Sequence, residues 1–249
     1  MDNYFKKFVE QRNQNTINNY NENFSDDELW YMFMNDGYCD LDNDGFPKDI
    51  NYEISDKYLF WKYQVNMYKK AIETGGIITG RILDVACGRG GGLSFINDFY
   101  NFDELVGVDL NPNHIKLAKM INKDNVSLEC KSIIDTDFNN ESFDVINCIE
   151  ANTYFIPYEI YVKKIYDYLK KDGHYIQVSP IKENFMNLFD DVGFKKIKEI
   201  DITKNVRMSC AISKMRFKNI SKKVSQIFAN DEQRYNNDVS NYTIYVFKK

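Results

Sequence analysis

Residues 81 to 95 read Arg-Ile-Leu-Asp-Val-Ala-Cys-Gly-Arg-Gly-Gly-Gly-Leu-Ser-Phe, and this stretch indicates the fold. A short apolar run with one acid passes directly into four glycines and then into an apolar segment that suits a helix. This order predicts a strand, a tight turn and a helix. Glycine suits such a turn because it tolerates positive φ and lets a ligand approach the main chain.

The spacing of the glycines argues against one common nucleotide site. A dinucleotide fingerprint requires Gly-x-Gly-x-x-Gly, but the sixth position counted from Gly88 is Leu93. The turn therefore does not fit an NAD-dependent dehydrogenase.

The spacing Asp84-x-Ala86-x-Gly88-x-Gly90 resembles motif I of the class I S-adenosylmethionine-dependent methyltransferases, with Ala86 where many members have glycine. The resemblance implies that this turn, which includes Arg89, holds the methionine end of S-adenosylmethionine. It also implies that the acid at the position of Asp84 orients the turn or the ammonium group of the cofactor. A glycine-rich connection without a ligand is the alternative.

A second acid supports a nucleoside site. Asp109 closes the next apolar run, and an acid at this place in doubly wound sheets accepts hydrogen bonds from both ribose hydroxyls. We expect Asp109, with Leu110 beside it, to bind the ribose of the cofactor. Pro112 opens the helix that follows. His114 is then either a partly exposed helix residue or a functional residue just below the ribose.

Apolar runs alternate with helical spacing from about residue 76 to the end of the chain. This alternation predicts an α/β core with a parallel sheet. The expected strands cover residues 81–86, 104–109, 126–130, 143–149, 174–179 and 194–202. The resemblance adds a last, antiparallel strand at 242–247, after a helical insertion at about 204–230. The expected fold is thus a Rossmann-like seven-stranded methyltransferase sheet, mostly parallel, and Thr203 is the expected helix cap after the sixth strand.

Residues 1–75 are expected to form a helical lid over the cofactor, because their apolar residues have partly helical spacing. Within them, Asn35-Asp-Gly-Tyr38 resembles an element that borders the methyl donor in methyltransferases of sterols, lipids and polyketide-like products. Tyr38 would then offer its ring to the sulfonium, whereas a Tyr that only fills a helix end is the alternative. Tyr20 is a second candidate of the same kind.

The adenine contact departs from the pattern of the family. Relatives in this subgroup often carry Gly-Asp-Ala after the third strand, where the acid holds the adenine amino group. This chain has Lys131, Ser132 and Ile133 at those places. The resemblance therefore leaves Ser132 and the main chain of Ile133 as the expected adenine contacts, without the acid.

The fourth strand resembles the family segment whose tip, here Ile149-Glu150, lies beside the transferable methyl group. Members related to the phthiotriol and sterol methyltransferases have Glu-Ala-Ser-His at this tip, but this chain has Thr153 in place of the histidine. An acceptor hydroxyl with a high pKa would need a base within hydrogen-bond reach. Glu150, Tyr154 and His114 are the candidates.

Composition limits the class of protein. The chain has 249 residues, with 32 basic and 37 acidic side chains and a formal charge of -5, which disfavours DNA and RNA as partners. Its five cysteines never form a Cys-x-x-Cys pair, and this pattern fits a reducing compartment. No segment is long and apolar enough to span a membrane. We expect a cytoplasmic protein that acts on a small molecule, and a homodimer stays open.

One acidic segment imitates a metal site. Asp40-Leu-Asp-Asn-Asp-Gly-Phe-Pro47 resembles the start of a calcium loop, but Asn51 stands where the loop needs a bidentate Glu, and Pro47 interrupts it. We expect a solvated turn and no metal.

These observations favour a methyltransferase that acts on a hydroxyl of a natural product or a lipid-like compound. Transfer from a sulfonium depends mostly on orientation of the reactants, so absent acid–base residues are tolerable. Transfer to carbon or nitrogen stays open. A cofactor-binding but inactive regulatory partner is a third alternative, because the acid near Ser132 and the histidine at Thr153 are absent.

Overall fold

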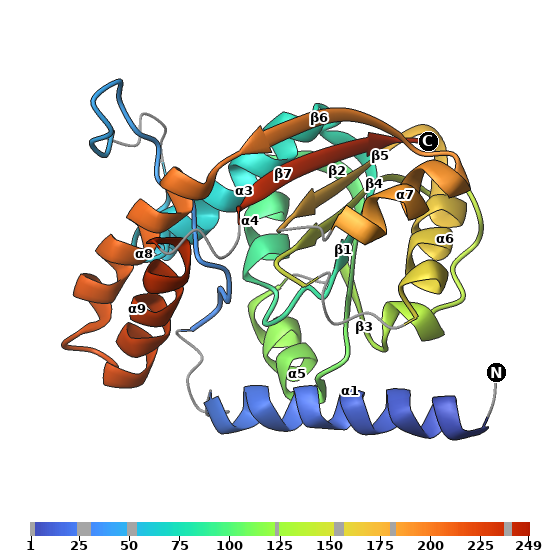
Figure 1. The fold of residues 1–249 in the computed structure, drawn as a ribbon, viewed down its shortest axis with the longest axis horizontal. Coiled ribbons are helices and arrows are strands. Elements are labelled where there is room, and N and C mark those ends of the chain that lie inside the picture. The colour runs from blue at the N-terminus through green and yellow to red at the C-terminus, as the bar shows by residue number, and fades with distance from the viewer. Residues whose placement is uncertain are drawn as a thin grey trace.

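The computed structural model describes residues 3–23, 31–48, 54–122, 125–151, 157–179, 183–236 and 241–249. Within them a seven-stranded sheet forms the centre, and helices cover both of its faces (Figure 1). The strands are β1 (Thr79–Val85), β2 (Asn101–Asp109), β3 (Val126–Cys130), β4 (Phe143–Ile149), β5 (Leu169–Val178), β6 (Lys195–Asp201) and β7 (Thr243–Lys248).

The strand order is β3-β2-β1-β4-β5-β7-β6. Strands β1 to β5 pair in parallel, and β7 is antiparallel to both of its neighbours, β5 and β6. The predicted mostly parallel, seven-stranded α/β sheet with an antiparallel last strand is therefore confirmed. In this order the carboxyl ends of β1, β2 and β4 lie side by side, so residues that follow these three strands meet at one edge of the sheet.

The helices are α1 (Asn3–Asn23), α2 (Asp56–Leu59), α3 (Lys62–Gly75), α4 (Gly91–Phe99), α5 (Pro112–Ile121), α6 (Tyr158–Tyr168), α7 (Glu183–Val192), α8 (Thr203–Phe217) and α9 (Lys222–Asn236), with a 3-10 turn, η1 (Ile133–Asp135). None of the helices in the described part of the chain has both the length and the apolar character needed to cross a membrane.

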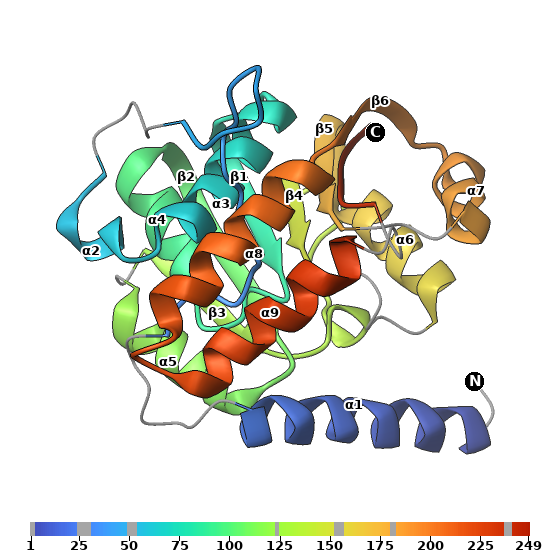
Figure 2. The same ribbon diagram turned by 60° about the vertical axis from the view of Figure 1, so that its left-hand side comes forward.

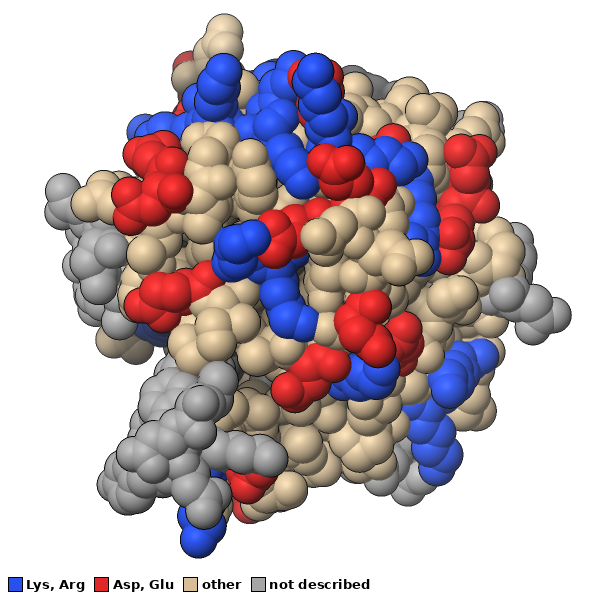
Figure 3. Space-filling view, turned by 90° about the vertical axis from the view of Figure 1, so that its right-hand side faces the viewer, with Lys and Arg blue, Asp and Glu red and all other residues tan. Residues whose placement is uncertain are grey.

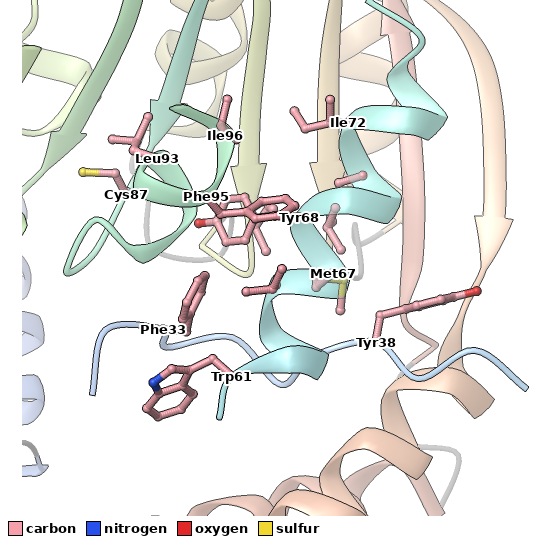
Figure 4. Packing of buried hydrophobic residues seen from close by; sticks show 14 of the residues in the cluster. Phe33, Tyr38, Trp61, Met67, Tyr68, Ile72, Cys87, Leu93, Phe95 and Ile96 are labelled. Carbon is pink, nitrogen blue, oxygen red and sulfur yellow. The ribbon is translucent and has the colours of Figure 1, made fainter. Parts of the chain in front are cut away.

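Each face of the sheet has its own apolar core. On β4, Val145 packs with the helices α3 and α4, whereas Ile146 packs with α6 and α7. This alternation follows from the two-residue period of a strand, and burial on both faces explains why β4 is apolar throughout. Figure 4 shows the first core, where Ile72 of α3 and Leu93 of α4 point toward the sheet.

The N-terminal residues contribute two unlike pieces. Helix α1 lies beneath α5 at the bottom of Figure 1, where Asn111 Nδ2 donates to Asn21 Oδ1 at 2.9 Å. Helix α3 instead lies on the sheet, and its residues Ala71 and Ile72 are fully buried. Part of the segment expected as a lid is therefore also part of the main core.

Helices α8 and α9 form a hairpin beside α3 (Figure 2), in which the rings of Phe217 and Phe228 stack with centroids 5.4 Å apart. The prediction of Thr203 as the helix cap is wrong, because α8 begins at Thr203 itself and Ile202 precedes it. The hydroxyl of Thr203 accepts the N–H of Tyr242 at 2.7 Å instead. The hydroxyl of Thr203 therefore contacts the residue just before β7 and does not cap α8.

Charges are mixed on the face that carries helices α6 and α7 and the C-terminal end of the chain. Figure 3 shows acidic side chains among the Lys and Arg side chains on this face. Ion pairs such as Lys170 with Asp144 and Lys248 with Asp172, each at 2.7 Å, belong to the same edge of the sheet. The face therefore presents no continuous basic surface of the kind that binds a phosphate polymer.

Candidate functional site

The glycine turn joins β1 to α4 and is held in an unusual conformation. Ala86, Gly88 and Gly90 have φ values of 57°, 55° and 79°, all in the left-handed region. A Cβ at Gly90 would lie only 2.5 Å from the side-chain nitrogen Nδ2 of Asn122 and 2.8 Å from Cβ of Ala118. Conformation and space therefore both require glycine at position 90, which lets the start of α4 approach α5 closely.

Ala86 is the exception in this turn, because it has a side chain and yet adopts positive φ. The left-handed region costs an L-residue roughly 1–2 kcal/mol. Such strain persists where the surrounding structure enforces it, which is common at functional sites. Alanine in place of glycine therefore adds strain to this turn.

Asp109, at the end of β2, ties the glycine turn to α5. Its Oδ2 accepts the N–H of Gly88 at 2.9 Å, and its Oδ1 accepts the N–H of Asn111 at 2.8 Å. His114 Nδ1 lies 3.3 Å from the same Oδ1. A carboxylate has about four lone-pair sites, so the geometry leaves acceptor capacity for hydroxyl groups.

The loops after β2 and β3 lie together next to Asp109. Cys130 Sγ, at the end of β3, donates to the carbonyl of Leu110 at 3.7 Å. Ser132 begins the turn η1, where its hydroxyl accepts the N–H of Ile134 at 3.3 Å, and Ile133 is almost fully buried. The structure thus brings Leu110, Ser132 and Ile133 to the same edge of the sheet as the glycine turn.

Glu150 follows β4 directly and has a φ of 64°. Its main-chain N–H donates to Val178 O at 2.8 Å, while its Oε1 accepts the N–H of Asp36 at 2.9 Å. Burial raises the pKa of Glu150 well above its ordinary value, the negative charge of Asp36 raises it further, and a hydrogen bond from Tyr242 opposes the shift. Glu150 follows Ile149, which is buried, so its carboxyl group lies at an apolar strand tip.

Residues 31–36 run across the glycine turn, and we call them the crossing segment. The carbonyl of Met32 accepts the N–H of Gly91 at 3.2 Å. A Cβ at Gly88 would lie 3.5 Å from the sulfur of Met34, so that side chain lies directly against the turn. The segment then reaches Glu150 through Asp36. Sequence reasoning missed Met32 and Met34, although they directly precede the Asn35-Asp-Gly-Tyr38 element.

The structure does not bring Tyr38 to the glycine turn. Figure 4 shows its ring on the opposite side of α3 from Cys87, and Lys70 Nζ lies 5.6 Å from the ring centroid. Its main chain is fixed there, because its N–H donates to Tyr63 O at 2.8 Å. Tyr20 belongs to α1, but its side chain lies outside the described residues, as does all of Tyr154.

His114 lies on the ribose side of the site and not near Glu150. It is buried in the first turn of α5, next to Asp109. Strands β2 and β4 flank β1, so their ends are two strand spacings, roughly 10 Å, apart. The two candidate bases are therefore not brought together.

Asp84 lies beneath the turn and is only 1% exposed. Tyr68 donates its hydroxyl to Asp84 Oδ2 at 3.4 Å, but Oδ1 has no hydrogen-bond partner among the described residues. Burial raises the pKa of Asp84 to about 8, the bond from Tyr68 opposes this shift, and the charge of Asp109 adds to it. This carboxyl group is therefore mostly neutral at pH 7 in the structure as it stands.

Three comparisons with known proteins agree with this geometry. Residues 82–173, which include the glycine turn and the tips of β2 and β4, match a family model described as a methyltransferase domain. Residues 82–173 are therefore similar to methyltransferase domains, and the sheet has the fold of the class I S-adenosylmethionine-dependent methyltransferases.

Two curated methyltransferases resemble the chain in sequence. A phthiotriol/phenolphthiotriol dimycocerosates methyltransferase of Mycobacterium leprae is 28% identical over 144 residues, which cover 57% of this chain and 51% of the relative. A fatty-acid O-methyltransferase of Mycolicibacterium smegmatis is 22% identical over 170 residues, which cover 68% of this chain and 59% of the relative. The chain therefore aligns with only about half to three fifths of the length of these methyltransferases.

A solved methyltransferase shares the fold over nearly the whole chain. Geranyl diphosphate C-methyltransferase of Streptomyces coelicolor A3(2) superposes with a TM-score of 0.72 and covers 95% of this chain and 97% of its own, at 12% identity. At this identity the similarity concerns the fold, and it extends the methyltransferase architecture beyond the residues that the family model matches.

The glycine turn of this domain suits S-adenosylmethionine by its chemistry. Gly88 and Gly90 present no side chain to a ligand, and Asp109 retains acceptor capacity for ribose hydroxyls. Asp84 has a buried oxygen that finds no hydrogen-bond partner among the described residues, and this oxygen lies beneath the turn. The residues present therefore fit this cofactor.

The acidic segment near residue 40 makes an ordinary turn. Asp42 Oδ1 accepts the N–H of Asp44 at 3.0 Å and the N–H of Phe46 at 2.8 Å, so this carboxylate caps its own loop. Asn51, where a calcium loop would close, lies outside the described residues. Among the residues that the structure does describe, no three His, Cys, Asp or Glu side chains gather in a way that could hold a metal ion.

Proposed function

We propose that the protein transfers a methyl group from S-adenosylmethionine to a hydroxyl oxygen of a natural product or a lipid-like small molecule. The observation that supports this most is the position of Glu150. Its half-buried carboxyl group, with a raised pKa, follows the strand next to the glycine turn and is oriented by the N–H of Asp36. In its ionised form, a carboxylate with a raised pKa is a stronger base than an ordinary glutamate, which suits a hydroxyl acceptor.

The proposed cofactor contacts follow the edge of the sheet. We assign the methionine end to the turn and to Asp84, the ribose to Asp109, and the adenine to the loops after β2 and β3. The proposed contacts are Asp84, Ala86, Gly88, Arg89, Gly90, Asp109, Leu110, Ser132, Ile133, Ile149 and Glu150. Met34, which lies against Gly88, joins this set.

When bound, S-adenosylmethionine supplies a methyl group that is already activated on a sulfonium. The ionised carboxylate of Glu150 would accept the proton of the acceptor hydroxyl, while the methyl–sulfur bond would break and leave a neutral thioether. The N–H of Asp36 and the fixed main chain of Glu150 hold the carboxylate in one orientation. Ile149 and Ala151, on either side of Glu150, are buried and make the strand tip apolar.

A labelling experiment tests the proposal. The protein is incubated with methyl-labelled S-adenosylmethionine and extracts of its source organism, and labelled products are identified by mass spectrometry. A labelled methyl ether supports transfer to a hydroxyl oxygen, whereas a labelled methyl ester would point to a carboxyl acceptor. A labelled methyl group on carbon or nitrogen would show that the acceptor atom is not oxygen, but it would still support methyl transfer.

Two further outcomes have distinct meanings. Binding of the cofactor without any labelled product would favour a cofactor-binding regulatory partner. Failure to bind S-adenosylmethionine at all, in a protein that circular dichroism shows to be folded, would contradict the proposed function as a whole.

The proposed cellular setting rests on the cysteines. All five, Cys39, Cys87, Cys130, Cys148 and Cys210, are free thiols in the structure. Cysteines without disulfides are usual in reducing compartments, so we propose a cytoplasmic location.

A further inference from the structure

Two polar side chains lie next to each other beneath the glycine turn. Asp84 on β1 and Asn147 on β4 are in register on neighbouring parallel strands, whose backbones run about 4.8 Å apart. Both project into the core shared with α3 and α4, since Ile82 and Val145, two residues before each, belong to it. Asp84 is 1% exposed, and Asn147 is fully buried. They form a polar pair in an apolar layer.

Three atoms of this pair have no hydrogen-bond partner among the described residues. They are Asp84 Oδ1 and both polar atoms of the Asn147 amide, Oδ1 and Nδ2. Buried polar atoms are nearly always paired, so this exception needs an explanation. An ionised Asp84 could only accept, whereas a protonated Asp84 could donate to Asn147 Oδ1.

The carboxamide of Asn147 suits both forms of its neighbour. With a neutral Asp84, its carbonyl oxygen accepts the carboxyl proton. With an ionised Asp84, rotation of the amide by about 180° presents the N–H donors to the carboxylate. A residue that serves both protonation states fits a carboxyl group that changes its charge during function.

Among the described residues, no cationic side chain acts on the pKa of Asp84. Tyr68 faces it from α3, Cys87 from the turn, and Asp109 from the end of β2. The start of α4 contributes Gly92, which lies against the ring of Tyr68. Burial and the charge of Asp109 therefore favour the neutral carboxyl, and a cation is the partner that this site lacks.

We propose that Asp84 and Asn147 share a proton beneath the glycine turn, and that the ammonium group of a ligand bound at the turn displaces this proton to solvent. The O–H bond of Asp84 breaks, the proton passes to buffer, and the new carboxylate faces the positive charge. Asn147 then donates an N–H to it. The inference rests on the proposed function for the identity of the ligand, and it makes Asp84 and Asn147 binding residues with no part in methyl transfer.

Proton release can be measured with S-adenosylhomocysteine, which carries the ammonium group but lacks the sulfonium near Glu150. The full chain is titrated calorimetrically at pH 7 in two buffers with different ionisation enthalpies. We expect the release of about one proton per ligand, and an association constant that rises by up to about tenfold per pH unit between pH 6 and 8. Binding without proton release would overturn the inference and leave the proposed function standing. Absence of binding would overturn both.

Two variants test which carboxyl group releases the proton. Asp84→Asn should bind the ligand without releasing a proton, while Glu150→Gln, which removes another carboxyl group with a raised pKa, should release as much as the wild type. Release that survives in Asp84→Asn but disappears in Glu150→Gln would overturn the assignment.

A measurement on the wild type covers the case in which Asp84→Asn does not fold. An infrared difference spectrum of the free and the bound protein should show the loss of a C=O band from a protonated carboxyl group. A difference spectrum without that band would also overturn the inference.

Discussion

The main-chain N–H of Asp36 donates to the carboxyl group of Glu150 at 2.9 Å, and the hydroxyl of Ser209 donates to the carbonyl of the same Asp36 at 2.8 Å. The crossing segment is therefore fixed between the tip of β4 and helix α8. A Cβ at Gly37 would lie 2.5 Å from Ser209 Oγ, so the two segments pack closely. The orientation of the proposed base thus depends on a helix far away in the sequence.

Ser209→Ala should lower kcat by roughly five- to tenfold, which corresponds to the 1 kcal/mol or so of a lost hydrogen bond. Cofactor affinity should stay unchanged, because Ser209 contacts neither the glycine turn nor Asp109. Steady-state kinetics with an identified acceptor would measure both quantities. Ser213→Ala, on the same buried face of α8, is the control and should change kcat little. Equal losses in the two variants would speak against the role of Ser209.

Ala86→Gly should stabilise the protein by roughly 0.5–1 kcal/mol, because glycine adopts the observed φ of 57° without steric cost. Urea unfolding measures this change. Ala71→Gly, in the buried interior of α3, should be destabilising and serves as the control. If Ala86→Gly lowered the midpoint as much as the control, the turn would not be strained at this residue.

Asp109→Ala should weaken the binding of S-adenosylmethionine by roughly 1–3 kcal/mol, because ribose hydroxyls would lose their acceptor and the turn its anchor at Gly88. NAD should not bind in either protein. Titration calorimetry measures the affinity of each protein for S-adenosylmethionine and for NAD. Asp103→Ala, at an exposed position of the same strand, should bind like the wild type. Unchanged affinity in Asp109→Ala would contradict the assignment of Asp109 as the residue that binds the ribose.

The stability of the free protein should depend on pH through Asp84. Its folded pKa of about 8 lies above the ordinary value of 3.8, so the folded state keeps a proton that the unfolded state has lost between these values. The free energy of unfolding should therefore fall as pH rises from about 4 to 8, by up to about 1.4 kcal/mol per unit from this group. Glu150 contributes with the same sign.

Urea unfolding at several pH values separates the two carboxyl groups. Asp84→Asn should flatten the dependence between pH 5 and 8, and Glu150→Gln should flatten it further, while Asp231, whose pKa burial also raises, keeps its contribution. A wild-type stability that rises over this range, or a slope that Asp84→Asn leaves intact, would be inconsistent with a neutral Asp84.

Cofactor binding should slow amide exchange in the crossing segment more than in the central strands. These residues lie against the turn through Met32 and Met34, and segments of low local stability show the largest change when a ligand covers them. Hydrogen exchange followed by mass spectrometry measures the effect. Equal protection in the crossing segment and in β1 would show that the crossing segment does not respond specifically to the cofactor.

The sequence predicted the sheet well because its strands are buried on both faces. Runs such as Phe143–Ile149 carry apolar residues on both sides, and only a parallel sheet covered by two helical layers explains that pattern. The start of β5 was placed too late, at residue 174. The strand begins at Leu169, and polar residues around Asp172, which has a φ of 63°, interrupt the apolar pattern at a register shift.

Side-chain positions outside the core were harder to predict. Local pattern suggested Thr203 as a cap, but the contact of its hydroxyl with Tyr242 depends on how β7 returns to the sheet. Tyr38 carries the expected motif, yet Met34 is the residue that lies against Gly88, because Gly37 turns the chain before Tyr38. A linear sequence gives the motif but not the direction in which the chain leaves it.

The measurement that tests the central claim most directly is a single-turnover rate with saturating cofactor and the acceptor found by labelling. Glu150→Gln should lower that rate by roughly 10²- to 10⁴-fold, while cofactor affinity remains within about twofold of the wild type. Glu159→Gln, at the exposed start of α6, should react at the wild-type rate. An unchanged rate in Glu150→Gln would contradict the assignment of Glu150 as the base and, with it, the proposed transfer to a hydroxyl oxygen at the tip of β4.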